Sequence, residues 1–89
     1  MDAEAFEQQM TADGFTEIET KDLPHRPQNE PHVHDSTVRG LVIEGAFIVR
    51  RDGIEMAYGA GEHFEVAKGI RHTEEIGPQG ARVLIGRKY

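Results

Sequence analysis

The sequence predicts an all-β fold, an antiparallel β-barrel preceded by a short helix. From Val38 onward, short strand-like segments alternate with turn signals every 6–10 residues, which is typical of a β-sandwich or barrel. Three histidines flank this region: His32 and His34 precede it, and His72 follows His34 by 38 residues. These histidines can meet only if the sheet curls back on itself, as it does in a barrel.

The N-terminal third contains the predicted helix and the first strand. Residues 2–13 are predicted to be helical, and Phe6 and Met10, spaced i,i+4, would cover one flank of the barrel. Residues 15–20 alternate with a period of two and predict a strand. Residues 21–31 contain three prolines among polar residues and predict an irregular surface stretch.

Turn signals separate the remaining predicted strands. Asp52-Gly53 is typical of a two-residue hairpin turn with both residues at positive φ. Gly45 and the loop at residues 77–80 predict two further breaks. The predicted strands cover residues 38–44, 46–51, 54–58, 62–66 and 81–86. With the first strand and the segment around His72, these make about seven short strands with few apolar side chains. Closing the sheet and pairing two chains would hide strand edges and add core.

Length and composition restrict the classes of function. A chain of 89 residues predicts one domain, 1–89, with residues 1–14 as an arm and residues 31–89 as the barrel. The absence of cysteine leaves histidine and oxygen as metal ligands. A net charge of −6 argues against binding to nucleic acid or an anionic membrane. With no apolar run long enough for a membrane helix and no signal-peptide pattern, we expect a cytoplasmic protein.

Two motifs carry a resemblance to a known family. His32-Val33-His34 is followed at close distance by Leu41–Gly45, and Gly61 is followed by Gly69 and His72. In this order and spacing, the residues resemble the two motifs of the cupin superfamily, and the short gap between them is similar to that of small single-domain cupins. The resemblance implies a double-stranded β-helix, or jelly-roll, barrel. It also implies that the three histidines are metal ligands.

Three positions depart from the cupin pattern. Val38 replaces the Glu ligand, Ala67 replaces a Pro and Ile76 replaces an Asn. The first change leaves three imidazoles, which with open positions form a known catalytic zinc arrangement and also suit iron, nickel and copper. Within the family, the three-His iron centre of thiol dioxygenases is similar in its ligands. The predicted cofactor is therefore a divalent metal ion: Fe, Zn, Ni or Mn. The alternative is a set of histidines that only line a polar pocket.

Glu74 and Tyr58 are the candidate catalytic residues. Glu74 lies two residues after His72 and points to the same side if the segment is extended. It would then ligate the metal, act as a general base or orient a histidine; the alternative is a surface carboxylate beside Glu75. Tyr58 would supply a hydroxyl to the pocket or belong to the core.

Three further residues are candidates for substrate binding. Arg39 would pair with a substrate carboxylate or lie on the solvent face. Met56 and Phe64 would form core or pocket wall. Strand alternation places His63 on the face opposite Phe64, so His63 is expected to point outward.

Two classes of function remain open. The first is a metal-dependent enzyme of dioxygenase, isomerase or hydrolase type that acts on a small, anionic or oxygen-rich organic molecule. The alternative is a non-catalytic sensor that binds a small molecule without metal. A homodimer is expected in both cases, with residues 1–20 either facing the partner or covering the barrel.

Overall fold

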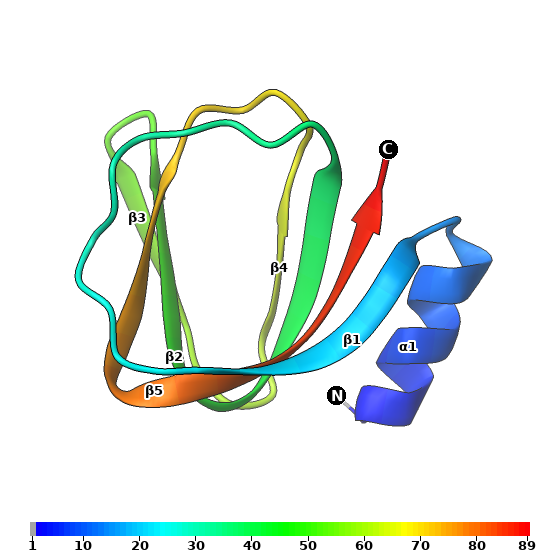
Figure 1. Ribbon diagram of the computed structural model, residues 1–89. Helices are drawn as coiled ribbons and strands as arrows, with labels where there is room; N and C mark the ends of the chain where they lie inside the picture. Colours follow the sequence, from blue (N-terminus) through cyan, green and yellow to red (C-terminus); the bar gives the residue numbers. More distant parts are fainter. Residues whose placement is uncertain (1) are drawn as a thin grey trace.

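The computed structural model describes residues 2–89; Met1, which belongs to the predicted arm, lies outside the described residues. One helix precedes five strands, and Figure 1 shows the helix against the outside of a curled sheet. The elements are α1 (Ala3–Ala12), β1 (Thr16–Leu23), β2 (Thr37–Arg51), β3 (Ile54–Tyr58), β4 (His63–Val66) and β5 (Thr73–Lys88). The mostly β architecture with a short N-terminal helix confirms the predicted fold class.

Helix α1 covers the outer face of the barrel, as the sequence predicts. Its N-cap is Asp2, whose side chain accepts a hydrogen bond of 3.0 Å from the Glu4 backbone N–H. Phe6 and Met10 are buried. They form a cluster with Phe15, Leu41 and Leu84. Residues near the N-terminus therefore cover this molecule's own barrel.

Strands β2 and β5 are longer than predicted, because the chain bends where breaks were expected. Gly45 in β2 has a φ of +81°, and Gly80 in β5 has a φ of +75°. A Cβ atom at Gly45 would overlap the carbonyl oxygen of Gly80, so the two strands approach closely at their bends. The predicted turn at Gly45 and the predicted loop at residues 77–80 are therefore wrong: both lie within strands.

The long strands connect two halves of one antiparallel sheet. Strand order is β1-β5-β2-β3, and β4 also pairs with β2. The first half of β2 pairs with β4 and the C-terminal half of β5; its second half pairs with β3 and the N-terminal half of β5. The enclosed core contains Val38, Val42, Phe47, Val49, Phe64, Val66, Ile76, Ala81 and Val83. The hairpin turn before β3 has Asp52 at φ +51° and Gly53 at φ +74°, which confirms its predicted geometry.

Residues 24–36 form an irregular segment that crosses the end of the barrel. In Figure 1 this segment, cyan to green, runs from β1 up the side and across the top to β2. Backbone bridges pair Arg26 with Ile76 and His32 with His72. Residues 24–31 are irregular as predicted, whereas residues 21–23, also predicted to be irregular, belong to β1. The segment is attached to β5 rather than lying free on the surface. His32 and His34 consequently lie on this segment and not on a strand.

Within residues 2–89, no helix has the length and apolar character that crossing a membrane requires.

Candidate metal centre

Three histidines and one glutamate converge at the end of the barrel. His32 and His34 come from the irregular segment. His72 immediately precedes β5, and Glu74 is the second residue of β5. Backbone hydrogen bonds of 2.9 and 3.0 Å join His32 to His72 and align the two chain segments. One ligand atom from each of the four residues lies within 4.8 Å of the others. The sheet therefore brings together the three histidines that the sequence singles out.

Backbone carbonyl groups orient two of the three imidazole rings. The Nδ1 atom of His32 lies 3.0 Å from the carbonyl oxygen of Glu30, and Nδ1 of His72 lies 2.9 Å from that of Ile70. An Nδ1–H group that donates to a carbonyl leaves Nε2 to donate to a carboxylate when it is protonated, or to ligate a metal ion when it is not. In both rings this Nε2 atom faces Glu74. The two rings are thus held in the orientation that suits ligation through Nε2.

The Glu74 carboxylate lies among the histidines rather than on the surface. Its Oε2 atom is 2.8 Å from Nε2 of His72, 3.3 Å from Nε2 of His34 and 3.7 Å from Nε2 of His32. Burial raises the pKa of Glu74, but hydrogen bonds from His72 and His34 outweigh this effect, and the net pKa is below the ordinary value. The surface alternative is therefore wrong for this residue. The extended conformation after His72 places both side chains on one side, as alternation requires.

Two residues that sequence reasoning did not single out hold Glu74 in place. The Arg26 guanidinium lies 3.5 Å from Oε1 of Glu74, the oxygen that faces away from the histidines. The Asn29 side chain accepts a hydrogen bond of 2.8 Å from the Glu74 backbone N–H. Both residues come from the proline-rich segment. Their roles depend on how that segment pairs with β5, which no local pattern encodes.

The donor set fits one divalent metal ion. Nitrogen and oxygen ligands bind zinc at about 2.0–2.2 Å, so ligands of one ion are separated by roughly 3.3–4.2 Å. The four atoms here lie within 4.8 Å of one another, a spacing close to that range. Imidazole nitrogen and carboxylate oxygen also suit iron, nickel and manganese. Because the chain contains no cysteine, thiolate does not compete for the position.

A cavity of about 200 Å³ adjoins the cluster inside the barrel. His34 and Glu74 line one part of it, and Val38, Phe47 and Phe64 line its apolar walls. Phe64 is buried and stacks on Phe47 with ring centroids 4.5 Å apart. The predicted pocket-wall position of Phe64 therefore agrees with the geometry. Val38, which stands at the family's Glu position, contributes an aliphatic wall here.

Arg39 lies away from the cluster. Its Nη1 group donates to Asp13 at 2.6 Å, and its Nε group donates to Glu65 at 2.8 Å. The guanidinium also lies 4.3 Å from the ring centroid of Phe15, under helix α1. Arg39 neighbours the inward-facing Val38 on β2, so its side chain points outward. Arg39 therefore takes the outer-face alternative, and a contact of Arg39 with a substrate stays a prediction.

Met56 and Tyr58 also take positions outside the four-residue cluster. Met56 is 47% exposed on strand β3, so the prediction that it forms core or pocket wall is wrong. Tyr58 is half-buried, and its ring packs against Phe64 at 5.6 Å between centroids. The cavity lining within residues 2–89 does not include Tyr58. His63 is exposed and contacts Phe6 of α1, as its outward orientation requires.

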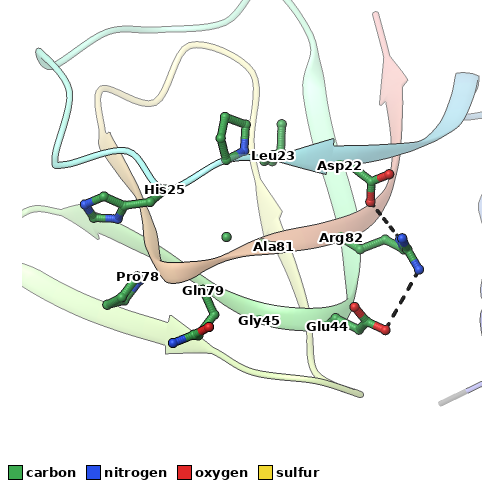
Figure 2. A pocket seen from close by; sticks show the side chains of 11 residues that line it. Asp22, Leu23, His25, Glu44, Gly45, Pro78, Gln79, Ala81 and Arg82 are labelled. Carbon is green, nitrogen blue, oxygen red and sulfur yellow. Dashed lines mark hydrogen bonds and ion pairs between the residues drawn. The ribbon is translucent and has the colours of Figure 1, made fainter.

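A larger and more open hollow, of about 690 Å³, lies where β2 and β5 bend. Figure 2 shows Arg82 between Asp22 and Glu44, with ion-pair distances of 2.7 and 3.9 Å. His25 also lines this hollow, and its Nδ1 atom is 2.9 Å from the carbonyl oxygen of Ile76. One guanidinium thus pairs with two carboxylates at this hollow, and the convergent ligand atoms lie instead in the histidine cluster, which is the better candidate site.

No protein-family model and no curated protein match the sequence. Solved structures do match the fold. A cupin-2 domain protein from Shewanella frigidimarina superposes with a TM-score of 0.67 at 18% identity, over 81% of this chain and 69% of that one. A predicted oxalate decarboxylase from Thermotoga maritima superposes with a TM-score of 0.67 at 16% identity, over 91% of this chain and 72% of that one. A transcriptional regulator from Vibrio cholerae superposes with a TM-score of 0.60 at 22% identity, over 88% of this chain and 45% of that one.

These likenesses agree with the two sequence motifs and with the bent, antiparallel sheet around an apolar core. At such low identity they bear on the fold and not on activity. The chain has the cupin fold.

Proposed function

We propose that the protein binds one divalent metal ion through His32, His34, His72 and Glu74. The ion would be Fe, Zn, Ni or Mn, and a small organic substrate would bind and react beside it. The observation that carries this proposal is the convergence of four ligand atoms within 4.8 Å. A bound metal ion supplies Lewis acidity to a substrate oxygen or to water. The reaction would be of dioxygenase, isomerase or hydrolase type.

The chain's own residues have separate tasks in this proposal. The carbonyl groups of Glu30 and Ile70 fix the orientation of two imidazoles. Arg26 holds the second oxygen of Glu74 and limits the rotation of its carboxylate. The apolar walls around Phe47 and Phe64 lower the local polarity beside the site and so strengthen polar interactions there.

Glu74 restores a carboxylate to the site from a different strand. The family pattern places its Glu on the segment that becomes β2, where this chain has Val38; here the carboxylate comes from β5. We favour a role as a metal ligand, because Oε2 faces all three Nε2 atoms. As a general base it would instead accept a proton from the substrate or from water at the same Oε2 atom.

The alternative function is a metal-free module that binds a small molecule. The mainly apolar walls of the cavity favour it, since they would hold a ligand without a metal ion. One structural neighbour is a predicted decarboxylase and another is a transcriptional regulator, so the neighbours do not separate the alternatives. Metal content does.

The test is elemental analysis by mass spectrometry of protein purified without a histidine tag or a chelator. We expect close to one equivalent of metal in the wild type and little in His72→Ala. His63→Ala is the matched control, because His63 lies on the outer face and contacts α1. It should retain the metal.

A wild-type protein that stays free of metal after incubation with Fe, Zn, Ni and Mn salts would overturn the proposal. It would then favour the metal-free binding module. Metal that persists in His72→Ala would show that the ion binds elsewhere.

A further inference from the structure

The cavity beside the cluster combines apolar walls with basic side chains. Lys21, Arg26 and Arg87 line it together with His34 and Glu74. Among the charged lining residues, three are cationic and one is anionic. This balance is the reverse of that of the whole chain, which carries a net charge of −6.

Strand register places two of these cations on the inner face of the barrel. Arg87 of β5 pairs directly with Val38 of β2, and Lys21 of β1 pairs directly with Val83 of β5. Directly paired residues on antiparallel strands project to the same face. Val38 and Val83 both belong to the enclosed core, so Lys21 and Arg87 also project inward.

The charges of these two residues are weakly compensated. The Lys21 ammonium pairs with Glu19 at 3.5 Å, with side chains 42% and 56% exposed, and exposed pairs of this kind are weak. Within residues 2–89, no ion pair engages Arg87. Its strand partner is Val38, at the position where the cupin pattern has a Glu. The substitution by valine therefore leaves an inward-facing arginine without a carboxylate opposite it.

We propose that Lys21 and Arg87 bind the carboxylate of a small organic acid whose apolar part contacts Phe47 and Phe64. Arg87 would bind the carboxylate through its planar guanidinium, and Lys21 would add a second positive charge. The other end of the molecule would then face Glu74 and His34. A volume of about 200 Å³ is below the ~300–1,000 Å³ of typical ligand pockets, which restricts the ligand to a few carbon atoms. The proposal deepens the proposed function and rests on it in one respect: a bound acid becomes a substrate only where a metal centre is present.

The test compares two probes of nearly the same shape, butyrate and its neutral amide, butyramide. Metal-free protein is titrated with each probe, and binding is followed by chemical-shift changes of backbone amides around the cavity. We expect butyrate to bind at least tenfold more tightly than butyramide. Arg87→Gln and Lys21→Gln should each lose most of this preference while keeping a dispersed, folded spectrum.

Lys68→Gln is the matched control. It removes one positive charge from an exposed loop residue outside the cavity lining and should keep the preference for butyrate. Equal affinity for the two probes, absence of butyrate binding up to its solubility, or an unchanged preference in Arg87→Gln would each overturn the inference.

Metal content measured on the same samples separates this inference from the proposed function. Arg87→Gln should retain the metal, because Arg87 does not belong to the ligand cluster. A wild-type protein that binds no metal but prefers butyrate would refute the metal centre and support the carboxylate site. A protein that binds metal but does not distinguish the probes would support the metal centre and refute the carboxylate site.

Discussion

The position of a single carboxylate determines the character of the candidate site. Val38 stands where the family pattern has a Glu ligand. With only the three neutral imidazoles as ligands, the metal-bound site would carry the full charge of the ion. Glu74 adds a negative charge from β5 and faces all three histidines. The ligand chemistry of a His₃Glu site is thus available although the first motif has lost its Glu.

Replacing Glu74 with Gln should therefore weaken metal binding at least tenfold, because an amide keeps the shape but not the negative charge. Affinity would be measured by competition with a chromogenic chelator.

Glu75→Gln is the control for this substitution. The neighbouring Glu75 accepts a hydrogen bond of 2.8 Å from Arg50 instead of facing the histidines, and its variant should bind metal as the wild type does. Equal affinity in Glu74→Gln would show that the Glu74 carboxylate is not a ligand.

At the same scale, sequence reasoning succeeded where alternation and motif spacing apply. The histidines and Phe64 follow from these rules, and so does the outward orientation of His63. The sequence could not predict the contacts of the Arg39 side chain, because its partners Asp13 and Glu65 lie 26 residues away on either side. Arg26 was missed because its contact with Glu74 spans 48 residues through an irregular segment.

At the scale of elements, the attachment of α1 depends partly on an ion pair at its C-terminal end. The hydrogen bond from Arg39, followed by one from Gln9, holds the pKa of Asp13 below its ordinary value. A carboxyl group whose pKa is lower in the folded than in the unfolded state stabilises the fold above the unfolded pKa. That contribution is lost as pH falls through the folded pKa.

The free energy of unfolding of the wild type should therefore decrease from about pH 5 towards pH 3 more steeply than that of Asp13→Asn. Urea denaturation over this range measures the difference. Glu7→Gln, an exposed change of the same charge on α1, should keep the wild-type slope. Parallel curves for wild type and Asp13→Asn would contradict the assigned role of the pair.

The bends of β2 and β5 are the second feature at this scale. Ala at Gly45 would meet both an unfavourable φ and the carbonyl group of Gly80, so we expect a loss of about 3 kcal/mol or more in unfolding free energy. Gly53→Ala is the comparison: Gly53 has a φ of +74° but open space around it, so only the conformational strain of about 1 kcal/mol should remain. Equal losses in the two variants would show that the close approach at Gly45 is unimportant.

Element boundaries show where sequence patterns reach their limit. Strand β3 matches its predicted residues, because a strong hairpin signal precedes it. At Gly45 and residues 77–80, the same kind of glycine signal marks a bend within a strand. Local composition cannot distinguish the two cases, because the partner strand across the sheet decides whether hydrogen bonding continues.

At the scale of the whole molecule, we propose a homodimer. A chain of 89 residues has a modest core, and association would remove further apolar surface from water. Phe6, Met10 and Phe15 cover the chain's own barrel, so the described part of the predicted arm, residues 2–20, fits the barrel-covering alternative. Sedimentation equilibrium should give about twice the chain mass of 10.0 kDa. A single species of one chain mass at micromolar concentration would contradict this expectation.

The two bent strands also have a consequence for how the molecule opens. Because β2 and β5 each run without a break through both halves of the sheet, neither half is a separate cooperative unit. His72 and Glu74 lie at one end of β5, and Leu84, which packs against the helix, lies near the other. Loss of order at either end would therefore spread along a shared backbone. Amide hydrogens in the two halves should exchange through the same global unfolding event.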